Sequence, residues 1–146
     1  MKVESILRSK PHQLETVQPW SSVESAIARL TGPPSIGALV VTGVEHGFTG
    51  MLSERDIIRS LARYGPETLH KQVRDVMSRH VPTCSPTDDL AHAMVEVTRT
   101  RYRHLPVLDR GELVGIVSIG DLVRARLEEM SLEAGVLRDL YLMGRR

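Results

Sequence analysis

The chain has 146 residues, 41% of them hydrophobic and 25% charged, and a formal net charge of +1. This composition is ordinary for a soluble globular protein and excludes a chain that is disordered throughout. The balanced charge and the aromatic content of 3% argue against a nucleic-acid binder. The apolar stretches are too short to span a membrane, and charged residues interrupt the first ten positions, where a signal peptide would need an apolar run. Because the single cysteine, Cys84, excludes an internal disulfide, we expect a cytoplasmic protein.

The first half of the chain predicts a short helix over residues 3–8, followed by a β-α-β-β-α unit. A strand over 14–17 leads to an amphipathic helix, for which Ser21 or Ser22 is the candidate N-cap. A buried strand over 36–41, a strand over 47–52 and a helix over about 54–63 follow. Gly65 and Pro66 end that helix, and a helical turn is expected over 73–77.

The second half predicts the same order of elements. A strand over 81–84 precedes a helix capped by Thr87, with Leu90 at its N3 position. Strands over 103–108 and 112–117 and a helix over about 119–129 complete the unit. A separate helix over 132–142 should carry an apolar stripe formed by Leu132, Val136, Leu137, Leu140 and Tyr141.

The two halves are copies of one another. Residues 16–19 match 83–86 at an offset of 67, and the offset becomes 65 where Gly50, Ser53 and Asp56 match Gly115, Ser118 and Asp121. The difference falls in a loop, at residues 42–47 and 109–111. We therefore predict an α+β fold of two repeats, over 12–64 and 79–130, with a C-terminal helical tail over 131–146. Because one such unit is too small to bury an adequate core, the repeats should pack as one pseudo-twofold module.

The strongest local signal is the stretch GMLSERD at 50–56 and its echo GIVSIGD at 115–121. In each, a serine and an aspartate three residues later lie where a strand meets a helix. The simplest interpretation is helix capping, because the serine accepts from first-turn amides and the aspartate favours the positive helix end. The functional alternative is a sugar or phosphate site, since ligands often bind where strand ends meet helix N-termini.

These stretches, together with IGALVVT at 36–42 and RYRHLPVLDRGELVGIVSIGDLV at 101–123, resemble a pair of CBS domains, the regulatory modules named after cystathionine β-synthase. The resemblance covers about residues 12–130. It implies a Bateman module with two clefts that bind an adenosine compound: AMP, ADP, ATP, NAD(H) or S-adenosylmethionine. It also implies a homodimer, a regulatory role without catalysis, and action on an unidentified protein partner in trans.

The same resemblance assigns ligand-binding residues by position, with the aspartates holding the ribose hydroxyls. In the cleft of the second repeat these are Thr83, Arg103, His104, Leu105, Pro106, Ile116, Ser118 and Asp121. In the cleft of the first repeat they are Thr16, Ile36, Gly37, Ala38, Met51, Ser53, Arg55 and Asp56. Since phosphate needs cationic donors, we favour the second cleft, which has Arg103 and His104.

Several alternatives stay open at this stage. His104 is either a phosphate ligand or a structural histidine at a strand start. Cys84 fits a small apolar residue better than a nucleophile, and the histidines show no metal-ligand spacing. The clefts are either functional or vestigial. In the vestigial case the chain is a structural or dimerisation scaffold that binds no ligand.

Overall fold

The computed structural model describes residues 1–9, 15–33, 36–44, 47–99 and 102–144. Within it the chain forms two compact units. Unit 1 comprises Met1–His12, Thr83–Val107 and Gly115–Arg146, and unit 2 comprises Gln13–Pro82 and Leu108–Val114. Each unit therefore collects one repeat together with a segment from elsewhere in the chain.

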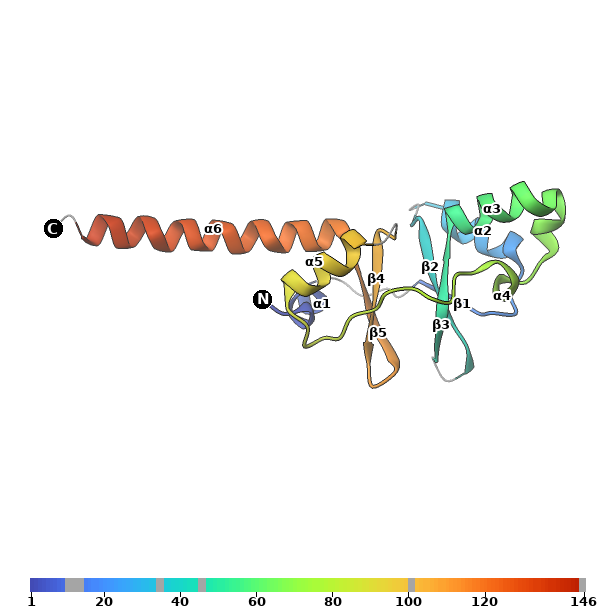
Figure 1. Cartoon of the computed structure of the whole chain (residues 1–146), viewed down its shortest axis with the longest axis horizontal. Helices are drawn as coiled ribbons and strands as arrows, with labels where there is room; N and C mark the ends of the chain where they lie inside the picture. Colours follow the sequence, from blue (N-terminus) through green and yellow to red (C-terminus); the bar gives the residue numbers. More distant parts are fainter. Residues whose placement is uncertain (10–14, 34–35, 45–46, 100–101, 145–146) are drawn as a thin grey trace. The chain divides into compact units, whose positions relative to one another are not determined.

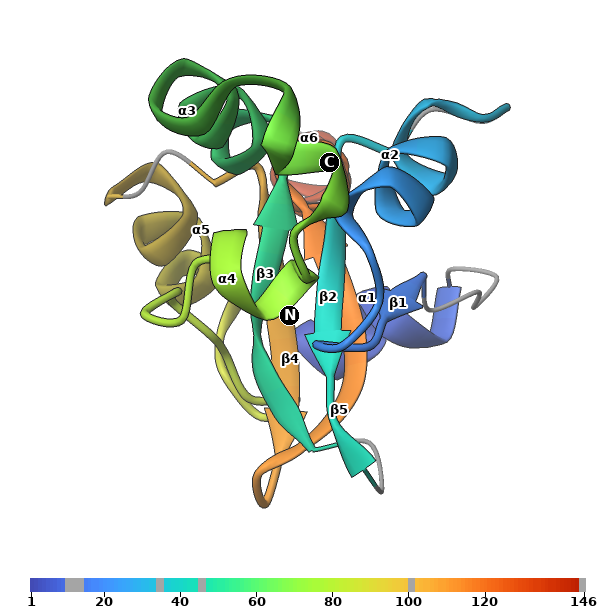
Figure 2. The ribbon, with the colours of Figure 1, turned by 90° about the vertical axis from the view of Figure 1, so that its right-hand side faces the viewer.

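Unit 2 contains the β-α-β-β-α order predicted for the first repeat. Its elements are β1 (Thr16–Val17), α2 (Val23–Thr31), β2 (Ala38–Thr42), β3 (Phe48–Ser53), α3 (Glu54–Tyr64), the 3-10 helix η2 (Gly65–His70) and α4 (Val73–Val76). β1 pairs parallel to β2, and β2 pairs antiparallel to β3 with Ala38 opposite Ser53 (Figure 2). The parallel crossover and the hairpin are confirmed. Leu14, the predicted start of the first strand, lies outside the described residues.

The core of unit 2 follows from the apolar spacing of its elements. Val23, Ala26 and Leu30 share one face of α2 and pack with Leu39 and Leu52 of the sheet. The N-cap of α2 is Ser22, whose side chain accepts a hydrogen bond from the Ser25 amide at 3.1 Å. α3 ends before Gly65, whose φ of 67° is a conformation that glycine adopts at no steric cost. The predicted cap and helix end are both correct.

Unit 1 contains α1 (Val3–Ser9), α5 (Leu90–Arg99), α6 (Ile119–Met143) and the larger part of β4 (His104–Asp109) and β5 (Glu112–Ser118), whose joined ends over Leu108–Val114 are assigned to unit 2. β4 and β5 form a two-stranded sheet. The strand predicted over 81–84 is wrong, because only one isolated parallel bridge forms there, between Cys84 and Val107. The Cys84 amide donates to the Pro106 carbonyl at 3.0 Å, whereas the flanking Pro82 and Pro86 have no N–H to extend a ladder.

Two predicted helix boundaries in unit 1 are also wrong. α5 begins at Leu90, so Leu90 is the first helical residue. Thr87 lies in the turn before it, where the Ser85 amide donates to the Asp88 carboxylate at 2.8 Å. α6 is one helix of 25 residues and replaces the two helices predicted over 119–129 and 132–142 (Figure 1). No proline interrupts this stretch, and an Arg126–Glu129 ion pair at 3.2 Å supports the helix where the break was expected.

The helices α1 and α4 play the same part in their units, an equivalence that the repeat alignment does not reveal. Three backbone hydrogen bonds join the α4 segment to the start of α2 and the turn before it. The amides of Val73, Arg74 and Val23 donate to the carbonyls of Ser21, Pro19 and Lys71, respectively. Three equivalent hydrogen bonds join the α1 segment to the start of α5 and the turn before it. The amides of Val3, Glu4 and Leu90 donate to the carbonyls of Asp88, Pro86 and Met1, respectively. α1 then adds Val3, Ile6 and Leu7 to the core of unit 1. The second repeat is completed by a helix from the start of the chain.

In the part of the chain that is described, every helix is either too short or too polar to serve as a membrane span.

Candidate functional site

In unit 2 the junction between β3 and α3 is a closed capping box. Ser53 accepts from the Asp56 amide at 3.3 Å, and the Ser53 amide donates to Asp56 Oδ2 at 2.9 Å. The Ser53 hydroxyl donates to the same oxygen at 2.9 Å. The other oxygen, Oδ1, accepts from the Ser78 hydroxyl at 2.7 Å. Both carboxylate oxygens of Asp56 are thus engaged within unit 2, and the residue is only 6% exposed.

In unit 1 the junction between β5 and α6 repeats the capping box but not its surroundings. The Ser118 amide donates to Asp121 Oδ2 at 2.9 Å, and the Asp121 amide donates to the Ser118 hydroxyl at 3.1 Å. Asp121 Oδ1 lies 3.8 Å from Nη1 of Arg124, one helical turn further along α6. The Asp121 side chain retains an exposed fraction of 12%. Asp121 is thus partly exposed, whereas Asp56 is buried.

Asp121 opens onto a cavity of about 210 Å³ in unit 1. The lining residues come from the N-terminal residue, α1 and α6: Met1, Ser5, Ile6, Ser9, Asp121, Arg124, Ala125 and Glu128. They combine hydroxyl groups, two carboxylates and a guanidinium. Such a set can hydrogen-bond a polyhydroxy group and pair with an anion. Among the described residues, Asp121 is the one predicted site residue that lines this cavity.

The other residues predicted for the second repeat lie on β4, on β5 and in the segment before α5. Arg103 is exposed just before β4, His104 is half-buried at its start, and Leu105 and Pro106 are buried within it. Thr83 and Ile116 are half-buried. The Arg103 carbonyl accepts from the Ile119 amide at 2.8 Å, which ties the start of β4 to the first turn of α6. Arg103 and Asp121 therefore belong to one connected junction.

The residues predicted for the first repeat are spread over different environments. Thr16 lines a cavity of about 720 Å³ with Trp20 and Arg29, and among the described residues neither Ser53 nor Asp56 lines it. Arg29 donates to the Thr16 carbonyl and pairs with Glu15 at 2.6 Å. Met51 is fully buried, Arg55 is exposed, and Ile36, Gly37 and Ala38 are half-buried. Thr16 and Asp56 are not brought into one cavity.

The glycine that opens each motif has a packing role. A Cβ on Gly50 would lie 2.3 Å from the Ser78 carbonyl oxygen, where β3 and the segment after α4 exchange two backbone hydrogen bonds. A Cβ on Gly115 would lie 2.5 Å from a methyl carbon of Leu7 in α1. Each glycine permits a close approach by the helical segment that completes its unit.

Sequence reasoning missed Ser78, Arg124 and Ser5. Arg124 carries a readable signal, because a cation three residues after a helical aspartate faces it across one turn. Ser78 and Ser5 carry none, since they reach the junctions only through the packing of α4 and α1.

The described residues offer no obvious metal centre or nucleophile. They contain no group of three or more His, Cys, Asp or Glu side chains that could hold a metal ion. Two of the histidines, His12 and His46, lie outside the described residues. Burial, with a smaller contribution from the charge of Asp88, raises the pKa of the Cys84 thiol to about 12. This thiol therefore stays protonated and unreactive at neutral pH.

Comparison with known proteins places these junctions in a family. The CBS domain family matches residues 3–63 and 73–128. The first match begins at α1 and the second at α4, the two helices that the structure shows to be equivalent.

Individual relatives agree with this match. The mitochondrial CBS domain-containing protein CBSX3 of Arabidopsis thaliana is 30% identical over 135 residues, which is 87% of this chain and 65% of that protein. This chain thus spans slightly less than two thirds of CBSX3. The crystal structure of the CBS-domain protein ATU1752 from Agrobacterium tumefaciens has a TM-score of 0.77 and 35% identity, and the match covers 86% of this chain and 92% of that one. CBSX2, a CBS-pair protein of Arabidopsis thaliana solved in complex with AMP, has a TM-score of 0.74 and 28% identity, with coverage of 88% and 98%.

Proposed function

This chain belongs to the CBS-domain family, and from that premise we propose that it is a regulatory module which binds an adenosine-containing nucleotide at the β5–α6 junction of unit 1. CBS-pair modules are generally regulatory and non-catalytic, and CBSX2 was solved with AMP bound. The candidate ligands are AMP, ADP, ATP, NAD(H) and S-adenosylmethionine. The proposal includes a homodimer and a protein partner regulated in trans.

The observation that carries the proposal is the contrast between the two aspartates. Asp121 is partly exposed, lines a cavity and has Arg124 beside it, whereas Asp56 is buried. A carboxylate holds a ribose diol by accepting hydrogen bonds from its hydroxyls, so the diol must be able to reach the carboxylate. In this proposal Asp121 accepts hydrogen bonds from the ribose hydroxyls, and the side chains of Arg103, His104 and Arg124 donate hydrogen bonds to the phosphate.

The remaining contacts are proposed by position. Ser118 flanks the sugar, Ile116 packs on the base, and Thr83, Leu105 and Pro106 border it. The corresponding set in unit 2, from Thr16 to Asp56, is proposed as the weaker site. Met51 and Asp56 are both buried there, so a nucleotide has less access to the carboxylate.

A second candidate function is a structural or dimerisation scaffold without ligand. It is supported by the capping boxes, since Ser53 with Asp56 and Ser118 with Asp121 satisfy the N-termini of α3 and α6 without any bound group.

A thermal-shift panel distinguishes the two functions. Protein stripped of carried-over nucleotide is tested with AMP, ADP, ATP, NAD, NADH, S-adenosylmethionine and GTP, beside the variants Asp121→Asn and Asp56→Asn. A ligand at 100 times its Kd adds about 2.7 kcal/mol to the free energy of unfolding, which raises Tm by several degrees. We expect an adenosine compound to raise Tm for the unmodified protein and for Asp56→Asn, but not for Asp121→Asn.

The matched substitutions make the result interpretable, because each keeps the side-chain size at a capping position. If no compound raises Tm, the sensor proposal fails and the scaffold stands. If Asp56→Asn loses the response and Asp121→Asn keeps it, the nucleotide binds at the unit 2 junction and our assignment is wrong.

A further inference from the structure

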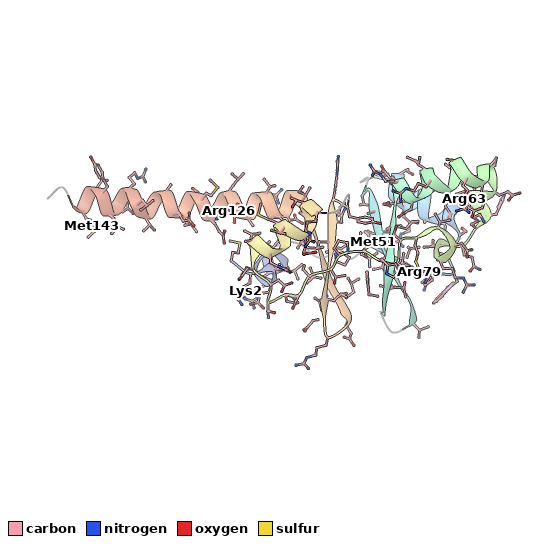
Figure 3. All side chains as sticks on the ribbon, viewed as in Figure 1. Lys2, Met51, Arg63, Arg79, Arg126 and Met143 are labelled. Carbon is pink, nitrogen blue, oxygen red and sulfur yellow. The ribbon has the colours of Figure 1, made fainter. Side chains whose placement is uncertain are left out.

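The C-terminal half of α6 presents large apolar side chains to solvent. Only Leu122 and Ala125 of this helix are buried, and both lie in its first two turns. Glu129 still pairs with the Met1 amino group at 2.9 Å. The C-terminal part of α6 then extends past α1 and α5, where its side chains stand away from the other elements (Figures 1 and 3). The exposed apolar residues are Val123, Leu127, Met130, Leu132, Val136, Leu137, Leu140, Tyr141, Leu142 and Met143. Exposed apolar surface of this kind marks an interaction site.

Part of this surface forms a regular seam. Successive members are separated by alternating steps of four and three residues: Val123, Leu127, Met130, Ala134, Leu137 and Tyr141. This spacing gives the a and d positions of a heptad repeat, and every such position from Val123 to Tyr141 is apolar. We call these six residues the α6 seam.

The remaining exposed apolar residues do not form a comparable seam. Leu132 and Val136 continue the face of Leu122 and Ala125, but the heptad positions on either side of them hold Glu129 and Asp139. A coiled-coil interface along that face would bury these two carboxylates, which is unfavourable without partners. The pattern therefore favours the α6 seam as the contact surface.

The placement of the seam leaves room for a partner. At 100° per residue, the seam lies about 130° around the helix from Leu122 and Ala125, which face the core of unit 1. Val123 is 45% exposed and Leu127 60% exposed, so the seam is accessible even where α6 packs on the unit. A second helix can lie along it without displacing the core.

The charges beside the seam select the partner and its direction. Glu133 is at a g position and Arg138 at the following e position. In a parallel pair of α6 helices, Glu133 of each copy faces Arg138 of the other, so two opposite-charge pairs form. In an antiparallel pair that overlaps along the whole seam, Glu133 of one copy faces Glu133 of the other, and Arg124 of one copy faces Arg138 of the other. Both pairs bring like charges together, which is repulsive.

We propose that α6 binds the α6 of a second copy of this chain as a parallel two-stranded coiled coil along the α6 seam. The inference rests on the homodimer included in the proposed function and identifies its contact. It does not depend on nucleotide binding.

Sedimentation analysis of the full chain tests the seam with two matched variants. Leu137 lies in the seam and is 66% exposed, whereas Leu132 lies outside it and is 68% exposed. Because both side chains are exposed in the single chain, neither substitution should unfold it, and a thermal melt checks this. We expect a dimer for the unmodified chain and for Leu132→Lys. We expect Leu137→Lys to weaken self-association on the order of 100-fold or more, because it places a charge in the interface of both copies.

Each other outcome overturns a defined part of the proposal. A monomeric unmodified chain rejects both the homodimer and the coiled coil. A dimer that survives Leu137→Lys rejects the coiled coil but leaves a homodimer through another surface. Loss of the dimer in Leu132→Lys rejects the seam as the contact. None of these results bears on the nucleotide site, which the thermal-shift panel tests separately.

Cysteine cross-linking tests the direction. In a parallel pair Leu127 faces its own copy, so Leu127→Cys should form a disulfide-linked dimer under mild oxidation. In the antiparallel pair residue 127 faces residue 137, so a disulfide forms only when Leu127→Cys is mixed with Leu137→Cys. The native Cys84 is buried and should not interfere. As a further check, Glu133→Arg should weaken the dimer, and adding Arg138→Glu should restore it.

Discussion

The β3–α3 junction of unit 2 and the β5–α6 junction of unit 1 carry the same capping box but use their aspartates differently. Asp56 is braced by Ser78, which follows α4. The counterpart of Ser78 in unit 1 is Arg8, at the end of α1, and its side chain is exposed and pairs with Glu4 at 3.9 Å. Asp121 instead has Arg124 nearby and opens onto a cavity. The residue at this position of the completing segment therefore differs between the repeats: Ser78 braces the motif aspartate of unit 2, whereas Arg8 is exposed in unit 1.

The largest expected effect concerns the motif glycines. A Cβ at Gly50 meets a backbone carbonyl oxygen, which cannot move without breaking the hydrogen bonds of the Met51–Ser78 bridge, whereas a Cβ at Gly115 meets the flexible end of Leu7. We expect Gly50→Ala to lower the free energy of unfolding by about 3 kcal/mol and Gly115→Ala by about 1 kcal/mol. Urea denaturation measures both. If the two substitutions lower the free energy of unfolding equally, the backbone contact at Gly50 is no tighter than the side-chain contact at Gly115.

The next largest effect is expected for the hydrogen bond from Ser78 to Asp56. Ser78→Ala removes a charge-assisted hydrogen bond to the buried Asp56 and should lower the free energy of unfolding by about 2 kcal/mol. Arg8→Ala is the matched change in unit 1. Because Arg8 is exposed and its ion pair is long, it should change stability by less than about 0.5 kcal/mol. If Ser78→Ala is as mild as Arg8→Ala, Asp56 is not braced as described.

The buried thiol distinguishes the repeats by pH. Cys84 corresponds to the buried Val17 of the first repeat. Its pKa is raised from 9.0 to about 12, so above pH 9 the unfolded chain loses a proton that the folded chain keeps. The stability contribution of the neutral thiol is complete below pH 9 and should fall by about 1.4 kcal/mol per pH unit above it. Cys84→Val should abolish this component of the stability profile between pH 9 and pH 11. A profile unchanged by the substitution would show that Cys84 ionises in the folded state.

The smallest effect concerns the N-termini of the equivalent helices α2 and α5. Ser22 caps α2 through its side chain, so Ser22→Ala should cost about 1 kcal/mol. Thr87 precedes the start of α5 and lies in an exposed turn, so Thr87→Ala should cost only a few tenths of a kcal/mol. Thermal melts of the two variants compare them directly. A larger loss in Thr87→Ala would restore the cap predicted from the sequence.

Much of the fold could be predicted from local patterns. The duplication, the strand and helix order of the first repeat, the β4–β5 pair of the second, the Ser22 cap and both capping boxes follow from periodicity and from residue types at fixed spacing. The failures have local causes as well. Prolines at 82 and 86 limit the expected strand to one bridge, and the residues around Met130 continue a helix that we expected to end with the second repeat.

The candidate site likewise has a part that local sequence patterns predict and a part that they do not. Ser118 and Asp121 can be found from the sequence because a capping box has a fixed spacing of three residues. The pairing of α1 with the second repeat, the brace of Ser78 on Asp56 and the cavity beside Asp121 cannot, since they join residues 22 to more than 100 positions apart. By itself the sequence determined the repeated elements and their caps, because these depend on interactions within a few residues. Only the tertiary structure decided which aspartate is buried and which is partly exposed, because that depends on where the chain returns to complete each core.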